Sequence, residues 1–125
     1  EVNEHNPGMN RILKEELDLP FREIKIDRLD TILESRGIDK VDFIKIDVEG
    51  FEYSVLKGGE KMLRHKPALF IELDDNNLRH HGHSATMLIG YLAGLGYTQF
   101  LRADNNQELN VNTDFSNCHY DITVR

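Results

Sequence analysis

The sequence predicts an α/β fold in which parallel strands come first and an antiparallel strand pair comes last. Two apolar runs, at 41–47 and 68–73, each end in acidic residues, and an amphipathic segment follows the first. After residue 97 the chain alternates apolar and polar residues and turns without a further helix, which favours antiparallel pairing of the late strands.

The composition limits the size and the partners of the molecule. Its 125 residues suffice for one domain with one core, and a net charge of -7 makes nucleic acid and anionic membranes poor partners. No apolar run approaches the roughly 20 residues that a membrane helix needs. The single cysteine, Cys118, fits a reducing, cytoplasmic compartment. Because the chain begins with Glu1 and not with Met, we expect it to be a piece of something longer.

The first forty residues are expected to hold short elements. A polar lead-in at 1–8 precedes an amphipathic helix at 9–17, and a brief strand at 24–26 follows. Asp27 is expected to cap the next helix, and Gly37 is expected to end it.

The remaining elements follow from glycine and cap positions. Gly58 and Gly59 should kink the helix after 41–47 or split it into two short helices, and a polar loop should follow 68–73. Ser84 is expected to cap a helix that Gly96 ends. Three late strands are predicted, at 97–102, around 109–111 (a weak one) and at 120–124.

The carboxylates at the ends of the two apolar runs are the first candidate site residues. Both acidic ends should emerge at one edge of the sheet, where open α/β sheets bind their ligands, so we assign catalytic roles to Asp47, Glu49 and Glu72. A carboxylate there can hold an ammonium group, accept a hydroxyl proton or ligate a cation. Glu49 has a structural alternative, which is to stabilise the following helix N-terminus. Lys45 is expected to be buried and to form an ion pair with Glu72.

The loop after the second apolar run carries His80, His81 and His83. A histidine can take the proton from a hydroxyl group during methyl transfer, so His81 and His83 are candidate catalytic bases. An exposed polar loop is the alternative. A zinc site from His81, His83 and a carboxylate lacks a convincing fourth ligand.

Three segments carry a family resemblance: IDRLDTILESRG, VDFIKIDVEGFEYSVLKGGEKML and KPALFIEL. Together they resemble the C-terminal half of FkbM-type methyltransferases, a branch of the class I S-adenosylmethionine-dependent enzymes with a Rossmann-like sheet. The resemblance covers about 23–73 in motif detail and extends to Val124 in element order. It implies that 41–47 and 68–73 are strands four and five of seven, with an antiparallel pair at the far end of the sheet.

The resemblance also implies the reaction and the missing parts. The methyl donor would be S-adenosylmethionine, contacted by Asp47 and Val48, and the acceptor a hydroxyl on a sugar, glycolipid or polyketide-like molecule. No glycine-rich turn or ribose-binding acidic residue stands before Val41. We therefore expect one partial domain, with 1–20 as lead-in and short helix and 23–125 as strands four to seven. Either the N-terminal half of the same protein or a homodimer at the exposed strand edge would complete it.

Three alternatives stay open at this stage. The chain could be a non-catalytic half-domain that oligomerises. A magnesium site resembling that of catechol-type O-methyltransferases would use Asp47, Asp75 and Asn76. A nucleotide-sugar glycosyltransferase would use Asp47 and Glu49 as a DxD-like metal motif.

Overall fold

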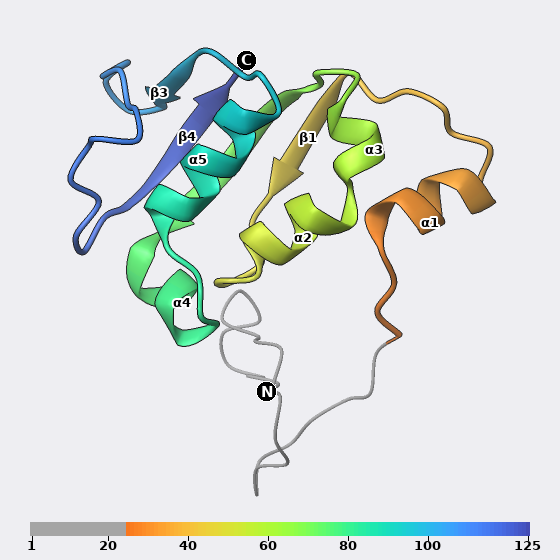
Figure 1. Ribbon diagram of the computed structural model, residues 1–125, viewed down its shortest axis with the longest axis horizontal. Helices are drawn as coiled ribbons and strands as arrows, with labels where there is room; N and C mark the ends of the chain where they lie inside the picture. Colours follow the sequence, from red (N-terminus) through yellow and green to blue (C-terminus); the bar gives the residue numbers. More distant parts are fainter. Residues whose placement is uncertain (1–24) are drawn as a thin grey trace, which may run out of the picture.

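The computed structural model describes residues 25–125 and contains a four-stranded mixed sheet with helices on one of its faces (Figure 1). The lead-in and the helix predicted at 9–17 lie outside the described residues, as does the start of the strand predicted at 24–26. In chain order the elements are α1 (Leu29–Ser35), β1 (Phe43–Ile46), α2 (Glu52–Gly58), α3 (Glu60–Leu63), β2 (Ala68–Asp74), α4 (Asp75–His80), α5 (Ala85–Gly94), β3 (Phe100–Arg102) and β4 (His119–Val124).

The sheet topology confirms the predicted fold class. The strand order is β1-β2-β4-β3, with β1 and β2 parallel. Strand β4 runs antiparallel to both of its neighbours, β2 and β3. The antiparallel pair therefore lies at the end of the sheet opposite β1, as the family resemblance implied.

One face of the sheet is packed. Leu69, Ile71 and Leu73 alternate along β2 and are at most 1% exposed, and they form one cluster with apolar residues of α2 to α5. Figure 1 shows α5 crossing this face in front of β4. The hydroxyl of Ser84 accepts a hydrogen bond from Met87 N and starts α5, so the predicted cap is confirmed.

The other face of the sheet is largely open within residues 25–125. The strand residues that alternate with the packed ones point to this face. Among them, Phe43 on β1 is 59% exposed, and Lys45 and His119 are also exposed. Strand β1 pairs only with β2 among the described residues, so one of its edges is free. None of the described helices is long and apolar enough to cross a membrane.

The helix that follows β1 breaks where the glycines predicted it would. Gly59 separates α2 from α3, and its own N–H bonds back to Leu56 O. The short α3 is held by α1, because the Asp30 carboxylate accepts hydrogen bonds from Lys61 N and Met62 N, both at 3.0 Å. An ion pair of 2.6 Å between Lys61 and Glu34 adds to this contact.

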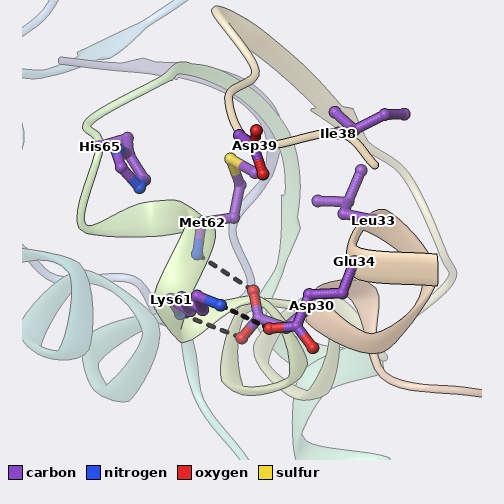
Figure 2. Close-up of a pocket in the computed structure, with 8 residues that line it drawn as sticks. All are labelled: Asp30, Leu33, Glu34, Ile38, Asp39, Lys61, Met62 and His65. Carbon is purple, nitrogen blue, oxygen red and sulfur yellow. Dashed lines mark hydrogen bonds and ion pairs between the residues drawn. The ribbon is translucent and has the colours of Figure 1, made fainter. Parts of the chain in front are cut away.

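Figure 2 shows the small cavity of about 50 Å³ at this junction, with the Asp30 carboxylate directed at the start of α3. The carboxylates of Asp30 and Glu34 in its wall are engaged in joining α1 to α3, and we assign the cavity a structural role.

Four local predictions were wrong, and a fifth was correct only in part. Residues 75–80 form helix α4 and not a loop, because Asp74 accepts a hydrogen bond from Asn77 N and caps the helix. Residues 25–28 form no strand, and Asp27 bonds to Arg28 N without capping α1. The segment around 109–111 makes only an isolated bridge between Leu101 and Glu108. The strand predicted at 97–102 is shorter, because residues 97–99 come before β3.

Candidate functional site

Acidic side chains gather where β1 and β2 end. Ile46 lies beside Ile71, so the next residues on the two strands, Asp47 and Glu72, follow side by side. The pKa of Glu72 is raised, first by burial and then by the negative charges of Asp47 and Glu49, while His119 lowers it. The structure thus brings together the three carboxylates that the sequence selected.

Lys45 does not form the predicted buried ion pair with Glu72. Its side chain is 56% exposed and its Nζ lies 2.6 Å from Asp47 Oδ2. This hydrogen bond is the main reason that the pKa of Lys45 is raised. With β1 at a free edge, Lys45 reaches the nearest carboxylate on its own strand and stays in contact with water.

The turn after β1 is shaped by a buried carboxylate that sequence reasoning missed. Glu52 is 1% exposed, and its Oε1 accepts hydrogen bonds from Val48 N at 3.2 Å and Gly50 N at 3.1 Å. Its Oε2 is buried without a hydrogen-bond partner among the described residues. A usable signal was present, because Glu52 lies one helical turn before Leu56, on the face predicted to be core.

Helix α4 closes the same turn from the other side. Glu49 and Gly50 have positive φ angles of 52° and 98°. Asn77 Nδ2 donates to Glu49 Oε2 at 3.1 Å, and Gly50 packs on the Asn77 backbone. The carboxylate of Glu49 is therefore held in place by α4. Glu49 also lies just before the N-terminus of α2.

The histidines His81 and His83 pack against aromatic side chains. The ring of His81 lies 4.0 Å from that of Phe51, and the ring of His83 lies 4.6 Å from that of Tyr53. Both histidines are half-buried, whereas His80 is exposed. Their catalytic role stays a prediction, and the structure shows that they also help to seat α4 and its following turn on α2.

A fourth histidine, His119, was not selected from the sequence. It begins β4, and the antiparallel register places it beside Asp74 at the acidic edge of the sheet. Its Nδ1 lies 2.9 Å from Asp74 Oδ2, and its Nε2 lies 3.7 Å from Glu72 Oε1. Only the pairing of β4 with β2 reveals this position, because local patterning around His119 carries no such signal.

The residues considered for metal binding are not arranged as a metal site. Asp75 is buried and accepts hydrogen bonds from Arg79 Nε and Ala85 N, which ties α4 to α5. Among residues 25–125 no group of three or more histidine, cysteine or acidic side chains could hold a metal ion. The magnesium alternative with Asp47, Asp75 and Asn76 and the zinc alternative with His81 and His83 are therefore not supported.

A groove of about 660 Å³ opens beside the turn after β1. This volume lies in the range of small-molecule sites, which are mostly apolar with a few polar groups. Val48, one of the predicted donor-binding residues, lies in its wall. The described residues that line it are Ile26, Asp27, Arg28, Leu29, Ile32, Val48, Phe51, Ser54, Val55 and Gly58.

The close contact between Gly50 and α4 gives a stability prediction. A Cβ at Gly50 would meet Asn77 O at 2.5 Å, whereas a Cβ at Gly82, which also has positive φ, would meet nothing within 4 Å. We expect Gly82→Ala to lower the free energy of unfolding by about 1 kcal/mol. We expect Gly50→Ala to lower it by about 3 kcal/mol or more, because the backbone must also move. Urea unfolding of both variants measures the difference, and equal losses would contradict tight packing of the turn on α4.

Comparison with known proteins identifies the family. A sequence profile described as "Methyltransferase FkbM domain" matches residues 15–98, which is more than half of the chain. No curated protein and no solved structure gives a significant match. The profile match spans β1, the turn held by Glu52, β2, and the helices α4 and α5. The chain belongs to the FkbM methyltransferase domain family.

Proposed function

We propose that this chain is a segment of an S-adenosylmethionine-dependent methyltransferase that methylates a hydroxyl oxygen on a sugar, glycolipid or polyketide-like acceptor. The observation that carries the proposal is the ligand-sized groove beside the turn after β1, within the segment that matches the FkbM family. Ligands of open α/β sheets bind at this edge, outside the carboxyl ends of the strands.

The described side chains suit the two ends of the donor differently. Val48 and Phe51 offer apolar surface in the groove for the nucleoside, and the Asp47 carboxylate offers a negative charge for the ammonium group. Asp47 is held in place by its 2.6 Å contact with Lys45. The protein would align the acceptor oxygen with the methyl group and sulfur, which supplies proximity and orientation.

Methyl transfer to a hydroxyl oxygen also needs a proton acceptor. Asp47, Glu49, Glu72, His81 and His83 are the candidates from the sequence. Glu72 has the strongest electrostatic support among the carboxylates, because its raised pKa makes it a better base than an ordinary exposed carboxylate.

Donor binding is the direct test of this function. S-adenosylhomocysteine titrated into the chain in a calorimeter should bind, and Asp47→Asn should raise the Kd about tenfold, equivalent to about 1.4 kcal/mol. The matched control is Asp42→Asn. Like Asp47, Asp42 forms an exposed ion pair with a lysine two residues earlier, Lys40, at 3.4 Å. Asp42, however, lies directly before β1 and not after it.

Two outcomes would count against the proposal. An unchanged Kd in Asp47→Asn would remove Asp47 from the donor site. Absence of any binding by the wild-type chain would favour the second candidate function, a non-catalytic half-domain. That candidate is favoured by the free edge of β1 and the exposed Phe43.

We propose in addition that the chain studied alone associates with a second copy through the free edge of β1. An apolar strand edge with unpaired backbone groups promotes pairing, and Ile26 and Ile32 add exposed apolar surface near the groove. The N-terminal half of the same protein would be the alternative partner at this edge.

Light scattering tests this association. The chain should scatter with at least twice its 14.5 kDa mass at high concentration, and Phe43→Lys should shift it toward the monomer. Met87→Lys is the control, because Met87 is also an exposed apolar residue but lies on α5. A clean wild-type monomer at high concentration would contradict the proposal.

A further inference from the structure

His119 stands between two carboxylates at the edge of the sheet where the candidate site lies. Asp74 pairs directly with His119 in the β2–β4 register, and Glu72 pairs with Asp121, so all four side chains point to the same open face. The side chain of His119 is 68% exposed, so a ligand can reach its ring.

The contact with Asp74 places one ring nitrogen of His119 beside a carboxylate. Nδ1 lies 2.9 Å from Asp74 Oδ2, and a carboxylate oxygen only accepts hydrogen bonds. A carboxylate beside Nδ1 favours the neutral tautomer with its hydrogen on Nδ1, which leaves the electron pair of Nε2 free. Asp74 is itself held, because its Oδ1 accepts from Asn77 N at 2.9 Å and caps α4.

Glu72 faces the remaining nitrogen. Its Oε1 lies 3.7 Å from Nε2, so a positive charge that develops on the ring during the reaction would lie beside a second carboxylate. The same carboxylate interacts electrostatically with Asp47 and Glu49, which connects His119 to the end of β1. Asp121 on β4 points to the same face, and the cation Lys45 on β1 interacts electrostatically with both Glu72 and Asp121.

We propose that His119 accepts the acceptor hydroxyl proton during methyl transfer and that Asp74 is its positioning residue. In this step the acceptor oxygen forms a bond to the methyl carbon, the carbon–sulfur bond breaks, and sulfur keeps the electron pair. The hydroxyl proton moves to Nε2 of His119, and the ring then carries the positive charge between Asp74 and Glu72. This inference rests on the proposed methyltransferase function.

The tautomer of His119 provides a test that needs no activity. Nitrogen-15 chemical shifts of the histidine rings at a pH where they are neutral should show the hydrogen of His119 on Nδ1. In Asp74→Asn the hydrogen should move to Nε2, the ordinary position, because the amide keeps the Oδ1 cap but loses the acceptor facing the ring. His80, exposed on α4, serves as the internal reference. A wild-type His119 with its hydrogen on Nε2 would overturn the proposal.

Kinetics test the catalytic step separately. With methyl-labelled S-adenosylmethionine and a set of methyl hexopyranosides as acceptors, His119→Gln should lower kcat by on the order of 10²-fold or more, with the donor KM within about twofold. His80→Gln, the matched control, should keep the wild-type kcat. Circular dichroism checks that each variant is folded.

The failures can be told apart. An active wild type with an equally active His119→Gln variant would overturn the role of His119 and leave the proposed function standing. A wild type without methyl transfer or donor binding would remove the proposed function itself, together with the catalytic step built on it.

Discussion

The rest of the candidate site depends on the turn at 48–50. The hydrogen bonds of the buried Glu52 carboxylate hold this turn in place. This turn reverses the chain between β1 and α2 and uses two consecutive residues with positive φ. Without an internal acceptor, the N–H groups of Val48 and Gly50 would lack these partners at a buried turn. Removing one partner from a buried hydrogen bond costs about 1–3 kcal/mol, so this single carboxylate is important for the geometry.

Fixing this turn fixes several neighbours at once. Gly50 packs closely on α4, and the Glu49 carboxylate accepts a hydrogen bond from the Asn77 side-chain amide. The ring of Phe51 packs against that of His81. Val48 then faces the groove. The candidate site is thus built on one side by β1 and α2 and on the other by α4, whose N-terminal cap, Asp74, also orients His119. One oxygen of the Asp74 carboxylate caps α4, and the other lies beside the ring of His119.

Features set by local physics could be predicted from the sequence. The end of β1 before Asp47 and the end of β2 at Asp74 follow from apolar runs that stop in acid. The break at Gly59 follows from its low helix propensity, and Ser84 was recognisable as a cap. That Asp47 and Glu72 meet follows from parallel pairing through one crossover. Apart from that pairing, these parts of the fold and site follow from the local sequence alone.

The errors arose where solvent exposure, distant pairing or an overlooked helix cap decided the outcome. Lys45 bonds to Asp47 because β1 is an edge strand in the described residues, a fact that its apolar sequence conceals. Helix α4 forms in a segment rich in Asp and Asn because Asp74 caps it. His119 joins the site only through the β2–β4 register, which links residues far apart in the chain. Glu52 would have been found by asking why a charged residue occupies an apolar helix face.

The central claim is that the turn after β1 and the groove beside it form the methyl-donor side of the site. The most direct measurement is an NMR titration of the nitrogen-15-labelled chain with S-adenosylhomocysteine, followed amide by amide. The account predicts saturable shifts concentrated at Val48, Gly50 and Phe51, with amides of β3 unchanged. Shifts confined to other parts of the chain, or none at saturating ligand, would contradict it.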